Sequence, residues 1–159
     1  MPIAIRPAAA NDLPLIASLI RELAAYEQLL HAVAFDEAEL GEHLFGPKPY
    51  AETIIGEIDG VAQGFALFFH IFSTFTGRPS IYLEDLFVRP EARGAGLGKA
   101  LLAYVAKLGV TRNCARMDWA VLDWNEPAIG FYRKLAAQPQ TGWTVMRLEG
   151  AALRDVASG

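Results

Sequence analysis

Residues 93–99 of the chain read Arg-Gly-Ala-Gly-Leu-Gly-Lys, with glycines at alternate positions between two basic residues. Because glycine has no Cβ, the backbone N–H groups of such a segment are open to a ligand and can converge on it. The segment runs into a predicted helix, and a helix N-terminus favours a negative charge. We therefore interpret residues 93–99 as a phosphate-binding loop, in preference to a flexible connection whose glycines only turn the chain.

Two better-known phosphate motifs do not fit this loop. The Walker motif requires a glycine five residues before Gly98 and a serine or threonine after the lysine, where this chain has Arg93 and Ala100. The dinucleotide fingerprint requires a glycine at the position of Lys99. The loop therefore predicts an anion site of a different class.

Acidic and aromatic residues form the second group that could do chemistry. Glu84 and Asp85 are adjacent in a predicted strand, and successive residues of a strand point to opposite faces. One of the two could therefore be only a solvated surface charge. Tyr132 stands in an apolar segment with Phe131 and Leu135, so taken alone it is typical of a core aromatic.

The elements that must position these groups follow from hydrophobic periodicity and turn residues. Strands are predicted at residues 3–6, 51–58, 61–72, 81–88, 117–122 and 143–148. Helices are predicted at residues 11–27, 36–45, 97–108 and 125–135. The first and the last of these ranges begin with a capping asparagine, Asn11 and Asn125. Asp59-Gly60 favours a tight hairpin, and Gly109 is a candidate helix stop. We expect one α+β domain over residues 1–159 with a mostly antiparallel sheet, whose parallel part is the strand–helix–strand unit at 81–122.

Composition excludes several classes of protein. The chain has 159 residues, 53% of them hydrophobic and 11% aromatic, which is typical of one globular domain and excludes a disordered chain. Its single cysteine excludes a disulfide framework, and its three scattered histidines lack metal-site spacing, so no metal is expected. Net charge is −4, which argues against nucleic acid as the main partner. Residues 64–72 are too short for a membrane span and no signal peptide is visible, so we expect a soluble, cytoplasmic protein.

The glycine loop and several other stretches together resemble the N-acetyltransferase superfamily known as GNAT, in particular its diamine/polyamine (spermidine/spermine-type) branch. The loop is similar to that family's coenzyme A pyrophosphate pattern, Arg-x-x-Gly-x-Gly. The other matching stretches, in the family's order over nearly the whole chain, are Arg6–Ala8, Tyr82–Val88, Trp124–Ala128, Phe131-Tyr132 and Gly142-Trp143. The resemblance implies the GNAT fold, a mixed, mostly antiparallel sheet flanked by helices, and a homodimer.

The resemblance also implies that acetyl-CoA is the co-substrate. The end of the strand at 81–88 would pair its main chain with the pantetheine arm, and an N–H there would polarise the thioester carbonyl. The glycine loop would hold the pyrophosphate, and the helix starting at Asn125 would contact the coenzyme from the other side. The residues so assigned are Leu86, Phe87, Val88, Arg93, Gly94, Ala95, Gly96, Leu97, Gly98, Lys99, Asn125, Pro127, Ala128 and Tyr132.

By the same resemblance, Tyr132 matches the general acid near the thioester sulfur, and Glu84 matches the group that takes the amine proton, directly or through water. An alkyl amine has a pKa of about 10.4, so only ~1 in 10³ molecules is neutral at pH 7. The thiol, with a pKa near ~8.5, is already a fair leaving group, so a base is needed more than an acid. The residues matching the family's amine pocket are Tyr26, Glu27, Glu84, Asp85, Asp118 and Trp119.

Two departures from the branch bear on the substrate. Gln140-Thr141 stands where an acid is expected before Gly142-Trp143, and residues 73–76 lack a carboxylate that polyamine-specific members have. Fewer acids pair fewer ammonium groups, and an unpaired, desolvated ammonium is costly. We expect a compact diamine, a lysine-like amino acid or another small primary amine, more than a long polyamine. The alternatives are acetylation of a protein lysine or N-terminus, and a non-catalytic acyl-CoA-binding module.

Overall fold

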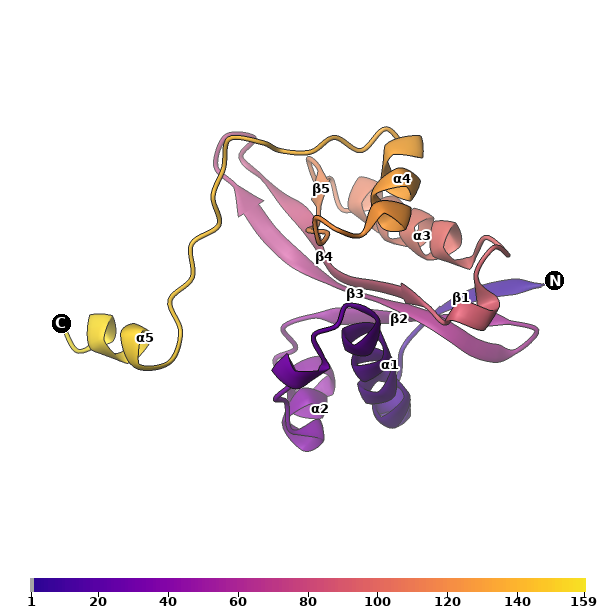
Figure 1. The fold of residues 1–159 in the computed structure, drawn as a ribbon, viewed down its shortest axis with the longest axis horizontal. Coiled ribbons are helices and arrows are strands. Elements are labelled where there is room, and N and C mark those ends of the chain that lie inside the picture. The colour runs from indigo at the N-terminus through magenta and orange to yellow at the C-terminus, as the bar shows by residue number, and fades with distance from the viewer. Residues whose placement is uncertain (1) are drawn as a thin grey trace. The chain divides into compact units, whose positions relative to one another are not determined.

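The computed structural model describes residues 2–159, whose contacts divide into two compact units, one ending at Ala120 and one spanning Val121–Gly159. The first unit holds a five-stranded sheet in the order β1-β2-β3-β4-β5 (Figure 1). Its strands are β1 (Ile3–Pro7), β2 (Glu52–Ile58), β3 (Val61–Ser73), β4 (Arg78–Val88) and β5 (Met117–Asp118). The first four pair antiparallel and β5 pairs parallel with β4, which confirms the predicted mixed sheet and α+β class.

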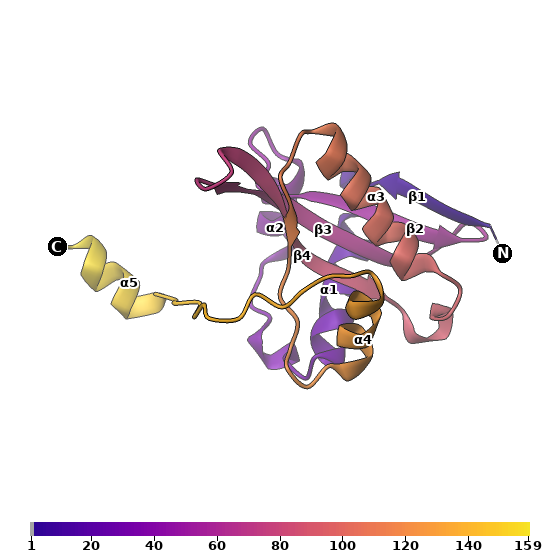
Figure 2. The same ribbon diagram turned by 90° about the horizontal axis from the view of Figure 1, so that it is seen from above.

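Helices cover both faces of this sheet. Figures 1 and 2 show α3 (Leu97–Thr111) on one face, and α1 (Leu13–Tyr26) and α2 (Glu37–Phe45) on the other. The core under α1 and α2 contains Ile16, Leu19, Leu23, Leu44, Ile55, Phe65, Leu67 and Phe87. On the α3 face, a Cβ added to Gly56 would lie 2.7 Å from Leu97 Cδ1, so the first turn of α3 packs directly on the backbone of β2.

Two hairpins connect the antiparallel strands. Asp59 and Gly60 have φ of 51° and 78°, the left-handed values of a type I′ turn, which confirms the predicted tight hairpin. The β3–β4 hairpin is longer than predicted, because Ser73 pairs with Arg78 and the strand begins there rather than at residue 81. The polar residues 78–80 were expected in a loop, but the pairing with β3 extends the strand through them.

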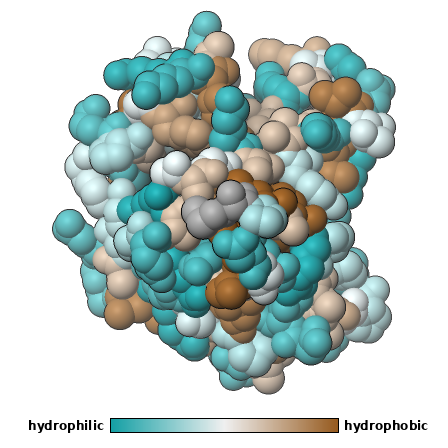
Figure 3. Space-filling view, turned by 90° about the vertical axis from the view of Figure 1, so that its right-hand side faces the viewer, coloured by the Kyte–Doolittle hydropathy of each residue, from teal (hydrophilic) through white to brown (hydrophobic). Residues whose placement is uncertain are grey.

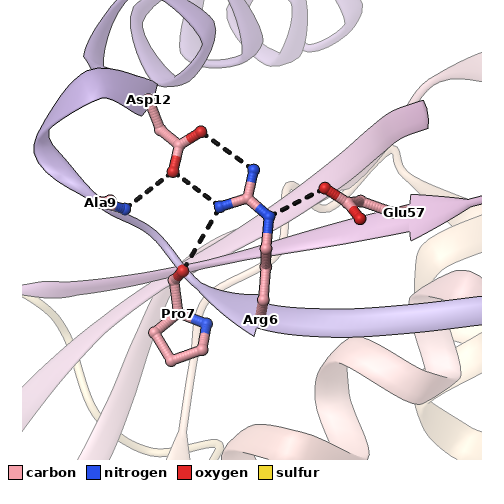
Figure 4. Close-up of polar contacts among 5 residues, drawn as sticks. All are labelled: Arg6, Pro7, Ala9, Asp12 and Glu57. Atoms are coloured by element: carbon pink, nitrogen blue, oxygen red, sulfur yellow. Dashed lines mark hydrogen bonds and ion pairs between the residues drawn. The ribbon is translucent and has the colours of Figure 1, made fainter. Parts of the chain in front are cut away.

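The start of α1 differs from the prediction. A 3₁₀ turn at Ala10–Asp12 precedes the helix, so Asn11 does not cap it. Instead the Asp12 carboxylate accepts hydrogen bonds from the Ala9 N–H at 2.8 Å and from Arg6 Nη1 and Nη2 at 2.8 and 3.0 Å (Figure 4). Arg6 Nε also donates to Glu57 Oε1 at 2.8 Å. These bonds tie β1, β2 and the start of α1 together, and those from Arg6 lower the pKa of Asp12.

The predicted stop of α3 at Gly109 is also wrong, because the helix continues to Thr111. Gly109 is buried inside it, and a Cβ there would lie 3.4 Å from Ile81 Cδ1 of β4. The glycine therefore serves close packing of helix on strand and does not end the helix.

The second unit contains α4 (Glu126–Lys134) and α5 (Gly150–Ala157). The Asn125 side chain caps α4 by accepting a hydrogen bond from the Ala128 N–H at 3.4 Å, and proline stands in the first turn, as predicted. The strand predicted at 143–148 is absent from the described residues, since no neighbouring strand takes up its backbone groups. The strand predicted at 117–122 ends at Asp118, where pairing with β4 ends. The helix α5 was not predicted.

Within residues 2–159, no helix is both long and apolar enough to cross a membrane. The face shown in Figure 3 carries mostly hydrophilic and intermediate residues, with the hydrophobic ones in small groups.

Candidate active site

The strand β4 carries a one-residue bulge at Glu84, in the middle of the acidic stretch. Leu83 lies opposite Phe68 and Asp85 lies opposite Leu67, so Glu84 has no partner on β3. A bulge of this kind bends a strand and re-aims its side chains. The expectation that Glu84 and Asp85 alternate between the two faces assumes a regular strand, and the ladder is interrupted at Glu84; Glu84 is exposed, whereas Asp85 is not.

The bulge also brings Asp85 to the face that carries α1. Tyr82 lies opposite Phe69 and Asp85 lies opposite Leu67, and these two β3 residues share a face. Without the bulge, Tyr82 and Asp85 would lie on opposite faces. Leu67 belongs to the core under α1, so Asp85 stands at the edge of that core.

Three carboxylates gather at this place: Glu27 at the end of α1, and Glu84 and Asp85 on β4. Burial, and then the charges of Glu84 and Glu27, raise the pKa of Asp85 to about 7. Burial and the charge of Glu84 also raise the pKa of Glu27. Among residues 2–159 no ion pair joins any of the three to a basic side chain. We call these residues the carboxylate cluster, and its excess negative charge suits a cationic ligand.

The outer edge of β4 is open beside this cluster. Only Ile81 and Tyr82 pair with β5, so within the first unit residues 83–88 have no strand on that side. The Arg89 N–H donates to the Gln63 carbonyl, so the alternation of an antiparallel ladder turns the main chain of Phe87 toward β3 and the main chains of Leu86 and Val88 toward this edge. The predicted coenzyme contacts Leu86, Phe87 and Val88 thus lie on a strand edge that no neighbouring strand covers, the kind of edge that accepts an extended ligand.

The glycine loop follows β4 and leads into α3. Gly94 and Gly96 have φ of 88° and 91°, which other residues rarely adopt, and Gly96 is the N-cap of the helix. No backbone hydrogen bond among residues 2–159 uses an N–H of residues 94–99, and no acidic residue stands in the first turn of α3. These free donors fit a pyrophosphate group, as the sequence predicts.

The two bases of the loop are placed differently. The Arg93 guanidinium lies over the rings of Tyr26 and Phe87, 4.7 and 5.7 Å from their centroids, and its Nε donates to the Val88 carbonyl at 2.9 Å. Lys99 is exposed, and no described hydrogen bond or ion pair involves it. Arg93 therefore contacts the ends of α1 and β4, in addition to placing a positive charge at the loop.

Residues 17–137 of the chain match the family described as Acetyltransferase (GNAT) family. The chain belongs to this family. A thialysine N-epsilon-acetyltransferase of Mus musculus is 39% identical over 96% of this chain and 96% of its own length. A spermidine/spermine N(1)-acetyltransferase-like protein 1 of Homo sapiens is 32% identical over 96% of this chain and 23% of its own length. An integron cassette protein from the mobile metagenome of V. cholerae has a TM-score of 0.81 at 27% identity, covering 100% of this chain and 99% of its own.

These comparisons confirm the resemblance to GNAT proteins and the predicted enzyme class, an acetyltransferase. They do not test single residues. Of the predicted site, the first unit of the acetyltransferase brings together Glu27, Glu84 and Asp85, and it places Tyr26 against Arg93. The residues assigned in the second unit, whose roles stay predictions, are Asn125, Pro127, Ala128 and Tyr132.

Asp118 and Trp119 lie at the end of β5 and just after it. Asp118 Oδ2 is 3.5 Å from Arg116 Nε, so a neighbouring cation already partly neutralises its charge. It is opposite Tyr82 across the parallel pair, and its charge helps raise the pKa of Tyr82, after burial and Glu84. Their roles in amine binding stay predictions.

Sequence reasoning missed the bulge at Glu84 and the stacking of Arg93 on Tyr26. A bulge depends on the register with β3, and no residue type in residues 82–86 marks it. An arginine after Pro-Glu-Ala could have signalled a side chain that turns back on the strand end, but only the three-dimensional structure identifies its aromatic partners. Among residues 2–159, no group of three or more His, Cys, Asp or Glu side chains could hold a metal.

Proposed function

We propose that this acetyltransferase transfers the acetyl group of acetyl-CoA to a primary amine of a small molecule that carries two ammonium groups, a lysine-like amino acid or a compact diamine. The observation that carries the proposal is the carboxylate cluster, which has no basic partner among the described residues. The Mus musculus relative named for thialysine supports a lysine-like amine.

The charge of the cluster matches a compact dication. Glu27 and Asp85 both have raised pKa values, which means that each resists ionisation while the pocket is without a cation. An ammonium group placed between them favours their ionised forms, so binding of the amine near neutral pH releases a proton from Asp85. Glu84 would then lie beside the second ammonium, the one to be acetylated.

Catalysis requires that the attacked ammonium lose its proton. We assign the Glu84 carboxylate as the acceptor of this proton, directly or through a water, because it is exposed at the bulge of β4 and adjoins the rest of the cluster. Deprotonation of an alkyl amine at pH 7 costs roughly 4–5 kcal/mol, which makes a nearby base valuable. The Tyr132 hydroxyl is assigned, on the family pattern alone, as the donor of a proton to the leaving thiolate.

Acetyl-CoA would supply a thioester carbonyl carbon for direct attack by the neutral amine in a ternary complex. The chain's contribution to its binding is main-chain donors: the open edge of β4 at residues 86–88 for the pantetheine arm, and the N–H groups of residues 94–99 for the pyrophosphate. Lys99 adds a positive charge at the loop. A single acetyltransferase domain over residues 1–159, a homodimer and a cytoplasmic location stay predictions of the family resemblance and the sequence.

The test is thiol release from acetyl-CoA by the purified protein with a panel of acceptors: lysine, thialysine, short diamines, spermidine, spermine, an aminoglycoside and a lysine-bearing peptide. We expect turnover with lysine-like amino acids or short diamines, slower turnover with spermine and none with the peptide. Fastest turnover with spermine would contradict the substrate assignment. Turnover of the peptide alone would favour a protein acetyltransferase, and acetyl-CoA binding without turnover of any acceptor would favour a binding module.

A further inference from the structure

Arg93 connects three parts of the first unit that have separate predicted roles. Its side chain begins at the glycine loop, its Nε donates to the carbonyl of Val88 at the end of β4, and its guanidinium stacks on Tyr26 at the end of α1. The distances are 2.9 Å for the hydrogen bond and 4.7 Å from the guanidinium carbon to the centroid of the Tyr26 ring. A planar guanidinium can make both contacts at once.

The contact between Arg93 and Tyr26 bears on how easily the last turn of α1 opens. Tyr26 is the last residue of the helix, Glu27 follows it, and Gln28 has a left-handed φ of 62°. The last turn of a helix lacks part of its hydrogen bonding and opens more easily than its middle. A contact that holds the Tyr26 ring therefore also limits the motion of the neighbouring Glu27 carboxylate, a member of the carboxylate cluster.

We propose that Arg93 is a positioning residue that couples the coenzyme loop to the amine-binding end of α1. By holding Tyr26 against the end of β4, it fixes Glu27 for the amine and the start of the glycine loop for the coenzyme. The inference rests on the proposed function for the identity of the two ligands. Because coupling between two binding sites is reciprocal, coenzyme that orders the loop also orders the end of α1, and the amine promotes coenzyme binding in return.

Lys99 serves as the control residue for the effect of positive charge, because it lies in the same loop and makes none of the contacts of Arg93. Arg93→Lys keeps the positive charge but loses the planar group that stacks and donates through Nε. We expect Arg93→Lys to raise the KM for the amine about 10-fold with a smaller change in kcat, from the loss of one cation–π contact and one hydrogen bond. Lys99→Gln should raise the KM for acetyl-CoA and leave the KM for the amine within about twofold of wild type.

A second readout needs no acceptor. Hydrogen exchange of the amides of Glu27 and Leu29, which donate to Leu23 and Ala24, reports opening of the end of α1. Coenzyme A should slow this exchange in the wild-type protein and in Lys99→Gln. In Arg93→Lys, coenzyme A should still protect residues 94–99 and no longer protect Glu27 and Leu29.

Tyr26→Leu tests the same contact from its other side, and it carries the test if Arg93→Lys does not fold. It should uncouple the end of α1 from coenzyme A as Arg93→Lys does, and the double variant should have little further effect on the KM for the amine.

The proposal is overturned if Arg93→Lys keeps the wild-type KM for the amine, or if coenzyme A protects the end of α1 in that variant. A lower Tm with both readouts unchanged would also overturn it, because that result assigns Arg93 a purely structural role. A wild-type protein that fails to acetylate any amine would contradict the proposed function, while the exchange experiment would still decide the coupling.

Discussion

The carboxylate cluster lies at the middle of β4 and the glycine loop follows the end of that strand. The two proposed binding regions use different parts of the chain, side chains in the cluster and backbone in the loop. The cluster consists of side chains whose charges repel one another and are partly removed from water, so its properties depend on residue identity. The loop consists of backbone N–H groups and left-handed glycines, so its properties depend on conformation. Changes of side-chain chemistry should therefore damage the first region, and changes of backbone freedom should damage the second.

The largest effect is expected when the cluster loses its proposed base. Glu84→Gln keeps the size of the side chain and removes its ability to accept a proton. We expect kcat/KM for the amine to fall about 10²-fold at pH 7, with the greatest loss at low pH, where the neutral amine is scarcest. Measurement of kcat/KM from pH 6 to 9 checks this, with the exposed Glu39→Gln on α2 as the control acid. Equal profiles for Glu84→Gln and wild type would rule out Glu84 as the base.

The next effect separates backbone from side chain in the loop. Gly96→Ala adds one methyl group that meets only Ile3 Cδ1, at an ordinary contact distance of 4.0 Å, but it places a Cβ on a residue with φ of 91°. Because this conformation costs other residues about 1–2 kcal/mol, we expect the loop to shift and acetyl-CoA to bind about 10-fold more weakly. Calorimetric titration measures the affinity.

The matched control is Gly60→Ala in the β2–β3 hairpin, where φ is 78° and a Cβ meets no atom within 4 Å. Gly60→Ala should lower the Tm about as much as Gly96→Ala does, and it should leave the affinity for acetyl-CoA unchanged. Equal losses of affinity in the two variants would show that general stability, and not loop conformation, determines coenzyme binding.

The same contrast explains which features could be predicted from the sequence. The β2–β3 turn and the cap of α4 depend on residues within a few positions, Asp59-Gly60 and Asn125, and both were predicted correctly. The glycine loop was likewise predicted from its own residues, although its pyrophosphate role stays a prediction. Local pattern was not sufficient at Asn11, because Asp12 instead bonds to Arg6 and to the backbone of Ala9.

Features that depend on a distant partner were missed. The bulge at Glu84 is a property of the register between β3 and β4, and the gathering of the carboxylates depends on where α1 ends. Gly109 is typical of a helix stop in the sequence, but the structure uses it to pack α3 on Ile81. The apolar pattern at 143–148 favoured a strand, yet Trp143 and Val145 are 79% and 91% exposed in a segment with no strand among the described residues. An apolar pattern alone does not supply the neighbouring strand that a new strand needs.

The smallest effect concerns stability and tests whether the cluster is strained by its own charges. The pKa of Asp85 is about 7 in the folded protein and 3.8 as its reference value. Between these values the folded protein binds more protons than the unfolded chain, so the contribution of Asp85 to stability falls as pH rises from about 4 to about 7.

Asp85→Asn removes this loss of stability, and at pH 8 we expect the variant to be more stable than the wild-type protein, with a Tm higher by roughly 4 °C. Its advantage should shrink as the pH is lowered toward 4, because the wild-type carboxyl then becomes neutral too. Thermal unfolding at pH 5, 6, 7 and 8 measures the trend. A wild-type protein that gains stability over Asp85→Asn as the pH rises would mean that a cation, and not repulsion, dominates at the cluster.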